Sequence, residues 1–285
     1  MPKNILGVKR DKQYSPNSAD RDTAVLLCTA RRLTADYGCR VRIVEESALE
    51  ATDFTSICAA FSMARSQRAL DLLSQAEEKG IPVINSPEGV RQLSRRNMYA
   101  ACGELNVQKP PFVTEQAAED TVARLPYPLW LKRDDACAQQ ESDIHFIDDD
   151  NSRREAFEDF RRRGISKYIL EKHLAGDVLK FYGVAGTKFF HCYYPTGQNG
   201  FSKFGMERIN GVAQGYVFNR RQARQQVDEL AGKMRVPVYG GDAIVSPEGV
   251  FHIIDFNDWP SYSSCLLEAS QAIAALIAGK AKMRG

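Results

Sequence analysis

Short apolar runs alternate with amphipathic helical patterns up to about residue 105, and this alternation restricts the fold more than any other feature of the chain. Apolar positions with a period near 3.6 indicate a helix, and a short apolar run between turn residues indicates a buried strand. On this basis we expect strands at 4–8, 39–44, 55–61 and 81–84, and helices at 19–37, 66–79 and 86–105. Strands that alternate with helices form parallel, doubly wound sheets. The N-terminal part is therefore predicted to be an α/β domain.

Beyond residue 105 the pattern changes to closely spaced strands, after a linker that Pro110 and Pro111 stiffen. The expected strands lie at 128–132, 144–147, 168–173, 178–185, 188–193, 239–245 and 250–257. The expected helices lie at 115–124, 153–163, 220–234 and 264–280, and a polar, Gly-rich loop at 195–215. This pattern is typical of α+β units. We predict a division of the chain into 1–88, 89–175 and 176–285.

The composition excludes several classes of protein. Of 285 residues, 44% are hydrophobic and 26% are charged, as in globular domains. A formal net charge of +2 does not suit a chain whose main partner is nucleic acid or a membrane surface. No apolar run approaches the roughly 18 residues of a membrane span, and the start is not a signal peptide, so we expect a cytoplasmic protein. The seven scattered Cys predict neither a disulfide framework nor a zinc site.

Two strand-like runs near the C-terminus, 239–245 and 250–257, carry acidic residues among apolar ones. A turn with Pro and Gly joins them, so we expect an antiparallel hairpin in which Asp242 faces Ile253. Cross-strand partners and residues two apart share a face of the sheet. The side chains expected on that face are Asp242, Ile244, Phe251, Ile253, Asp255 and Asn257, with His252 on the opposite face.

Asp242, Asp255 and Asn257 would thus bring three hard oxygen donors to one face. Such donors suit Mg²⁺ (or Mn²⁺), whose coordination is completed by waters and substrate phosphates. The sequence therefore predicts a metal site suited to nucleotide chemistry. A register slip of one residue would move Asp242 to the other face. The alternative is that Asp255 and Asn257 only end a strand and cap a loop.

Lys132 and Lys180 lie inside apolar strand runs, where an ammonium group without a partner is costly. An anionic ligand such as a phosphate would offset this cost. The alternative is that each lysine extends from a solvated face of its sheet.

Four motifs together are similar to those of one known superfamily. They are Arg95-Arg-Asn97, Pro128-Leu-Trp-Leu-Lys132, Tyr168-Ile-Leu-Glu-Lys-His-Leu174 and Ile253-Ile-Asp-Phe-Asn257. Over residues 81–261 the chain resembles the ATP-grasp superfamily. The resemblance implies a fold in which two α+β lobes clasp ATP behind the N-terminal parallel α/β domain. The small lobe would be 89–175, and 176–285 would carry the metal.

The resemblance also implies roles for single residues. Arg95, or alternatively Arg96, and Lys132 would bind the ATP phosphates. Glu171 would accept the adenine amino proton, and the backbone from Lys172 to Leu174 would complete the contacts to the base. Asp242, Asp255 and Asn257 would be the metal ligands.

Two departures from the pattern of the family concern the phosphates and the metal. The segment 133–143 contains no glycine, although most members have a Gly-rich flap there whose backbone amides cover the phosphates. The metal motif has Asp255 where most ligases of the superfamily have Glu. This form, together with Lys180 after Gly176 and Asp177, resembles the ATP-grasp inositol polyphosphate kinases. Either carboxylate can bind Mg²⁺.

The implied function is the use of Mg-ATP to phosphorylate a small-molecule acceptor of unknown identity. Arg208 and Asn210 resemble the loop with which the glutamate ligases of the family hold an acyl phosphate, so we expect a carboxylate–amine ligase, with Lys180 as a further catalytic residue. The alternative is a kinase with a basic bowl formed by Lys9, Arg10, Lys12, Lys180, Lys203 and Arg208. A third reading is an inactive ATP-binding protein. For partners we expect no nucleic acid and no membrane, and we allow for a homodimer.

Overall fold

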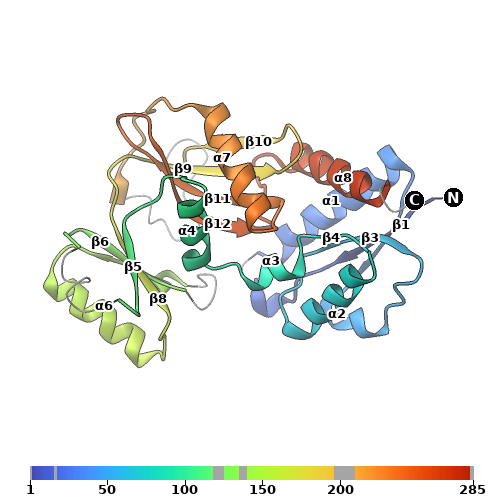
Figure 1. The fold of residues 1–285 in the computed structure, drawn as a ribbon, viewed down its shortest axis with the longest axis horizontal. Coiled ribbons are helices and arrows are strands. Elements are labelled where there is room, and N and C mark those ends of the chain that lie inside the picture. The colour runs from blue at the N-terminus through green and yellow to red at the C-terminus, as the bar shows by residue number, and fades with distance from the viewer. Residues whose placement is uncertain (1, 16–17, 118–124, 135–139, 196–208, 283–285) are drawn as a thin grey trace.

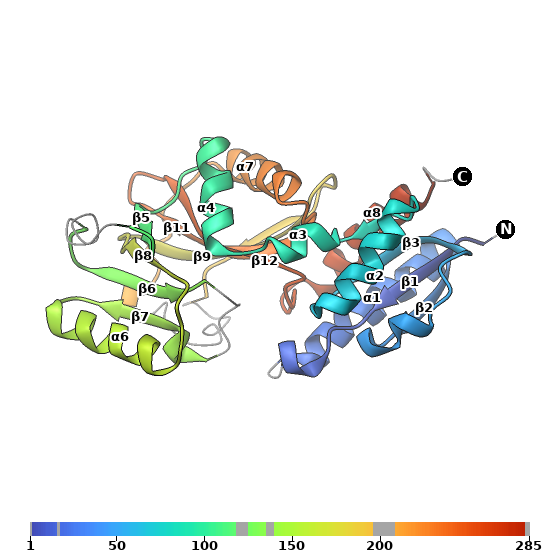
Figure 2. The ribbon, with the colours of Figure 1, turned by 60° about the horizontal axis from the view of Figure 1, so that its bottom comes forward.

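The structure is a computed structural model that describes residues 2–15, 18–117, 125–134, 140–195 and 209–282. Within these ranges the chain forms three four-stranded sheets. The first sheet lies at one end of the molecule, the second at the other end, and the third between them (Figures 1 and 2). The predicted combination of an α/β part with two α+β parts is confirmed.

The first sheet is parallel, and two helices far apart in the sequence share one of its faces. Its order is β2 (Arg40–Val44), β1 (Asn4–Val8), β3 (Ile57–Ser62) and β4 (Val83–Ile84). Helices α1 (Ala19–Tyr37) and α8 (Leu266–Lys282) pack on one face, and α2 (Gln67–Glu78) packs on the other. Helix α1 ends where the sequence predicts, because Gly38 takes the left-handed conformation with φ of 63°.

The second sheet is antiparallel and has a helix on one face only. Its order is β5 (Phe112–Thr114), β8 (Tyr168–Lys172), β6 (Leu129–Arg133) and β7 (Ile144–Ile147). Leu129, Leu131 and Leu170 pack against Phe160 of α6 (Asp150–Arg162). Since side chains alternate along a strand, Trp130, Lys132 and Glu171 lie on the opposite face.

The third sheet is antiparallel and brings the expected metal residues together. Its order is β10 (Phe190–Tyr193), β9 (Asp177–Val184), β11 (Val238–Val245) and β12 (Phe251–Asp258). Helices α4 (Arg95–Glu104) and α7 (Arg220–Lys233) cover one face with an apolar core. The other face carries Lys180, Asp242 and Asp255, which are partners across neighbouring strands. The chain also has 3₁₀ helices at Lys12–Tyr14, Glu46–Ala51 and Glu141–Asp143.

The prediction of one long helix at 86–105 is wrong, because the structure has two helices there. Helix α3 (Pro87–Arg91) ends at Gln92, and α4 begins after Ser94. The Ser94 hydroxyl accepts a hydrogen bond from the backbone N–H of Asn97, and the Asn97 amide donates to the carbonyl oxygen of Gln92. Ser94 is thus an N-cap inside the predicted helix, and it makes Arg95 the first residue of a new helix.

Most of the helix predicted at 115–124 lies outside the described residues, so it stays a prediction. Residues 115–117 form a turn after β5, a strand that the sequence did not predict, and 118–124 lie outside the described residues.

The register of the β11–β12 hairpin differs from the prediction, and a β-bulge compensates for the difference. Val245 pairs with Phe251 rather than with residue 250, which is the one-residue slip that would separate the carboxylates. However, Ala243 pairs with Ile253 and Asp242 with Asp255, so Ile254 is an additional residue on β12. Asp242 and Asp255 therefore become direct cross-strand partners.

The slip does change the neighbours of the carboxylates. Phe251 and Ile253 were expected beside them but belong to the core under α7, on the opposite face. His252, expected on that opposite face, pairs with Ile244 on the face of Asp242. Both expectations were wrong because they assumed that residue 245 pairs with residue 250, whereas it pairs with Phe251.

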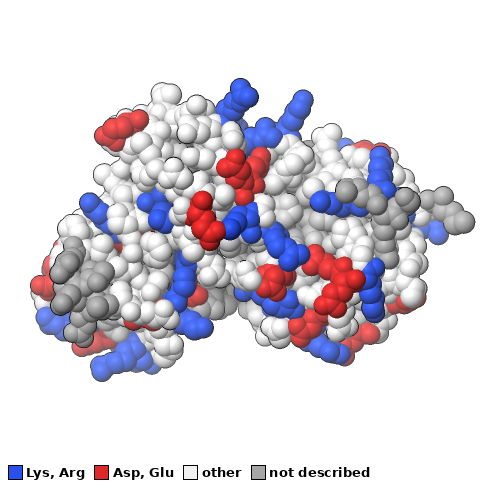
Figure 3. Space-filling model, viewed as in Figure 1, with Lys and Arg blue, Asp and Glu red and all other residues white. Residues whose placement is uncertain are grey.

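Both ends of the described chain lie at the first sheet (Figures 1 and 2), where the ammonium of Lys3 donates to the carbonyl oxygen of Ala281 over 2.6 Å. In the described ranges, no helix combines the length and the apolar character needed to cross a membrane. Positive and negative side chains are interspersed on the face shown in Figure 3. Each of the three sheets lies within one of the predicted divisions of the chain, although α8 packs on the first sheet.

Candidate functional site

A row of charged side chains crosses three strands of the third sheet. Lys180 on β9 is the partner of Asp242 on β11, which is the partner of Asp255 on β12. The ammonium Nζ of Lys180 lies 2.6 Å from Oδ1 of Asp242. Asn257, two residues after Asp255, donates from its amide to Oδ2 of Asp255 over 3.2 Å. The three residues predicted to hold a metal are therefore together on one face.

Asp255 stays charged because cations surround it. Burial would raise the pKa of the Asp255 carboxyl, but Arg95, Lys132 and Lys180, with a hydrogen bond from Asn257, hold that pKa below its usual value. Nη2 of Arg95 lies 3.5 Å from Oδ2 of Asp255. Three cations from three different elements thus act on one carboxylate.

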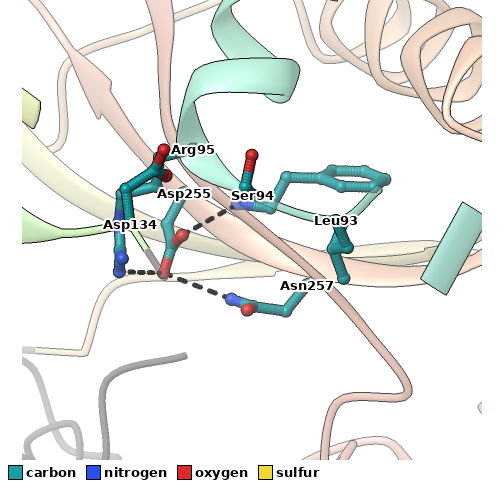
Figure 4. A pocket seen from close by; sticks show the side chains of 7 residues that line it. Leu93, Ser94, Arg95, Asp134, Asp255 and Asn257 are labelled. Carbon is teal, nitrogen blue, oxygen red and sulfur yellow. Dashed lines mark hydrogen bonds and ion pairs between the residues drawn. The ribbon is translucent and has the colours of Figure 1, made fainter. Parts of the chain in front are cut away.

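A small pocket opens beside Asp255, at the N-terminus of α4 (Figure 4). Figure 4 shows Arg95 and Asn257 both directed at the Asp255 carboxylate. The neighbouring Arg96 forms ion pairs with Asp134 and Glu115 instead, so Arg95 is the arginine at the site. The residues that line the pocket are Leu93, Ser94, Arg95, Asp134, Asp255, Phe256 and Asn257.

Lys132 and Glu171 contact each other. An anionic ligand was expected to offset the charge of Lys132, and in the structure its Nζ also has a partner in the chain, Oε1 of Glu171 at 2.5 Å. Oε2 of Glu171 accepts a hydrogen bond from the hydroxyl of Tyr99 over 2.6 Å. The Glu171 side chain is only 2% exposed and contacts Lys132 and Tyr99, and its contact with an adenine amino group stays a prediction. Burial and the charge of Glu171 raise the pKa of Tyr99 well above its usual value, which keeps this hydroxyl a donor.

The connection between β8 and β9, where adenine contacts were expected, is already hydrogen-bonded within the chain. The backbone N–H of Lys172 donates to the carbonyl oxygen of Pro111 over 2.9 Å. The carbonyl oxygens of Leu174 and Gly176 accept from the amide of Asn210 over 2.9 and 3.1 Å. The amide of Asn210 thus holds this connection, and its expected role at an acyl phosphate stays a prediction.

A carboxylate holds the loop that contains Asn210 in place. Asp177, at the start of β9, is buried and accepts hydrogen bonds from the backbone N–H groups of Gln214, Gly215 and Tyr216 over 2.7 to 2.9 Å. The loop after residue 209 is therefore fixed at two points to the segment that joins the two lobes.

Sequence reasoning missed three rings on the face of the second sheet that carries Lys132. Trp130 and Phe146 are cross-strand partners with centroids 4.9 Å apart, and Nε1 of Trp130 donates to Nδ1 of His173 over 3.1 Å. Burial lowers the pKa of His173, which favours its neutral form as an acceptor. From the sequence alone, an aromatic residue in an apolar strand is expected to belong to the hydrophobic core. The only signal for this face is that Trp130 lies two residues before Lys132, so that both side chains point to the same side of the strand.

The donor set fits a hard divalent cation. Asp242 and Asp255 supply carboxylates from neighbouring strands, and Asn257 supplies an amide. The described residues contain no group of three His, Cys, Asp or Glu side chains placed to hold a metal, so the protein would provide two charged ligands and one neutral one. Mg²⁺ is usually bound in this way, with waters and phosphates at its other positions.

Several residues expected at the acceptor site have other partners or lie outside the described residues. Lys9 pairs with Glu45, and Arg10 pairs with Asp22. Lys12 is exposed in a 3₁₀ helix. Arg208 and Lys203 lie outside the described residues.

Comparison with known proteins places this arrangement in a known fold. No family model and no curated protein matches the sequence. Among solved structures, the D-alanyl-alanine synthetase A of Vibrio cholerae superposes with a TM-score of 0.70 at 10% identity, over 99% of each chain. The D-alanine–D-alanine ligase of Bacillus anthracis complexed with ATP gives 0.66 at 12% identity, over 100% of this chain and 98% of that one. A RimK domain ATP-grasp protein of Sphaerobacter thermophilus gives 0.63 at 12% identity, over 96% and 99%. The chain, with its parallel sheet followed by two antiparallel sheets, therefore has the ATP-grasp fold.

Proposed function

We propose that the protein is an ATP-dependent ligase that phosphorylates a carboxylate and then joins the acyl group to an amine. One observation carries the proposal: Arg95 lies 3.5 Å from Asp255, Lys180 lies 2.6 Å from its cross-strand partner Asp242, and the charges of Arg95, Lys132 and Lys180 lower the pKa of Asp255. Phosphoryl transfer needs cations and metal-binding carboxylates close together, because they position the phosphates and stabilise their negative charge. The ligases with the same fold support this choice of reaction.

Each part of the site has a task in this reaction. Arg95, Lys132 and Lys180 would bind phosphate oxygens of ATP, and Asp242, Asp255 and Asn257 would hold Mg²⁺, which neutralises the charge of the transferred group. Trp130 and Phe146 offer an aromatic face on which the base could stack. In-line attack of a carboxylate oxygen on the γ-phosphorus would release ADP and leave an acyl phosphate. An amine nitrogen would then attack the acyl carbon and release phosphate.

The charges near the site favour a carboxylate acceptor over a polyphosphorylated one. A kinase for inositol phosphates needs several cations that are available to standing phosphates. Of the candidates in the described residues, Lys12 is exposed, whereas Lys9 and Arg10 each contact a carboxylate of the chain. The charges of Lys9 and Arg10 are thus neutralised by carboxylates of the protein rather than available to the phosphates of a substrate.

The test is ATP consumption with a panel of carboxylic acids, including amino acids, in the presence of hydroxylamine. Hydroxylamine attacks an acyl phosphate to give a hydroxamate, which is measured by its coloured iron complex. We expect acid-dependent release of ADP together with hydroxamate, and loss of both in Asp255→Asn by about 10²-fold or more. An inositol phosphate that gains phosphate without release of inorganic phosphate would support the kinase alternative. ATP binding without any turnover across the panels would support the inactive reading.

A further inference from the structure

We propose that Lys180 and Arg95 are placeholder counter-ions for the metal carboxylates, so that divalent metal and nucleotide bind cooperatively and each binds weakly alone. The proposal rests on the proposed function, since it concerns Mg²⁺ and ATP at the same site. It adds a property of these two cations that the fold does not imply.

Within the site, the candidate metal ligands contact charged groups of the chain itself. Lys180 contacts Asp242 at 2.6 Å, and Arg95 contacts Asp255 at 3.5 Å. The same oxygen of Asp255, Oδ2, also accepts from Asn257. The side chains on which a metal would depend are therefore engaged with cations and an amide of the chain.

The charges of the site balance without a ligand. Arg95, Lys132 and Lys180 face Asp242, Asp255 and Glu171, so three positive groups meet three negative ones. A divalent cation that binds alone would displace Arg95 and Lys180 from their carboxylates and leave both without a counter-ion. ATP that arrives alone would bring its phosphates next to carboxylates. When both bind, the metal contacts the carboxylates and the phosphates contact the released cations. Each ligand therefore offsets the unfavourable electrostatic free energy of binding the other.

Lys180 is the cation best placed to exchange. Its side chain is 16% exposed and that of Asp242 is 27% exposed, whereas the side chains of Lys132 and Glu171 are 8% and 2% exposed. A flexible lysine at a partly solvated pair can move its ammonium by rotation about its side-chain bonds. The buried pair of Lys132 and Glu171 stays as the fixed part of the site.

The experiment measures metal and nucleotide binding without turnover. Mn²⁺ binding to the nucleotide-free protein is followed by electron paramagnetic resonance, and ATP binding is followed by calorimetry in EDTA and in excess Mg²⁺. For the wild type we expect ATP to bind about 10- to 100-fold more tightly with Mg²⁺ than in EDTA. For Lys180→Met we expect Mn²⁺ to bind the nucleotide-free protein about 10-fold more tightly, because Asp242 has lost its placeholder.

The matched control is Lys188→Met, which removes the same charge from an exposed position of the β9–β10 turn. It should leave both affinities unchanged. Equal ATP affinity with and without Mg²⁺ in the wild type would overturn the proposal without any variant. Unchanged or weaker Mn²⁺ binding in folded Lys180→Met would also overturn it. A protein that binds neither ATP nor Mg-ATP would instead overturn the proposed function, and this inference with it.

Discussion

Lys132 and Glu171 show how two charges are accommodated in the apolar strands of the second sheet. Each is the other's counter-ion at 2.5 Å, and Tyr99 supplies a further hydrogen bond to Glu171. Buried ion pairs of this kind contribute little net stability when intact, but removal of one partner is costly. The contribution of this pair to the free energy of unfolding therefore depends on both residues together.

We expect Lys132→Met to destabilise the protein by about 3–5 kcal/mol, because it leaves the buried carboxylate of Glu171 without a cation. The double variant with Glu171→Gln removes both charges and should recover most of this loss. Urea unfolding of the wild type, the two single variants and the double variant completes the cycle. A Lys132→Met protein as stable as the wild type would show that Glu171 does not depend on the lysine.

At the scale of elements, the bulge in β12 determines whether the carboxylates meet. Ile254 is the additional residue, and on the neighbouring strand Gly241 allows the backbones to approach. A Cβ at Gly241 would lie 2.2 Å from the carbonyl oxygen of Asp255 and 2.5 Å from the ring of Phe181. The backbone oxygen cannot rotate away as a side chain could, so the position requires glycine.

Gly241→Ala should therefore destabilise the protein by about 1–3 kcal/mol, as overpacked core positions do, and should weaken Mg-ATP binding because Asp255 is displaced. The matched control is Gly279→Ala in α8, where a Cβ meets no atom within 4 Å. Alanine in a helix interior is favoured over glycine by about 0.5–1 kcal/mol, so this variant should be more stable than the wild type. Thermal unfolding with and without Mg-ATP measures both effects, and equal shifts in the two variants would contradict the steric argument.

At the scale of the whole molecule, β12 is tied to the first sheet by a buried charge cluster. Asp258 follows Asn257, and its side chain is 0% exposed. It forms an ion pair with Arg65, and Arg10 approaches it at 3.8 Å while also contacting Asp22 at 3.2 Å. Arg10 and Arg65 follow β1 and β3. Strand β12, which carries two of the candidate metal ligands, is thus fixed to the C-terminal edge of the parallel sheet.

Asp258→Asn should cost about 3 kcal/mol or more in the free energy of unfolding, because Arg65 loses its buried counter-ion and Arg10 loses a nearby negative charge. The control is Asp36→Asn, which breaks an exposed i,i+4 pair with Arg32 in α1. Such surface pairs contribute about 0.3–0.5 kcal/mol. Chemical denaturation of both variants compares them directly. Similar losses would mean that the cluster around Asp258 does not hold the two parts together.

The sequence by itself determined the elements and most of their bounds, because those depend on neighbours along the chain. The 3.6 period and Gly38 define α1, and the strands at 4–8 and 144–147 follow from short apolar runs. It also predicted that Asp255 and Asn257 share a face, since residues two apart on a strand do so. Even here, a local hydrogen bond at Ser94 divided a helix that periodicity alone made continuous.

Only the tertiary structure decided which partners the charged groups have. The register of β11 with β12 depends on a bulge that no local sequence pattern predicts. This bulge makes Asp242 the partner of Asp255. Lys132 finds Glu171, and Asn210 binds the connection between the lobes, across 39 and 34 to 36 positions of sequence. The C-terminal helix α8 covers the N-terminal sheet. These contacts join residues far apart in the chain, so their energies depend on how whole elements pack and not on the preferences of any one segment.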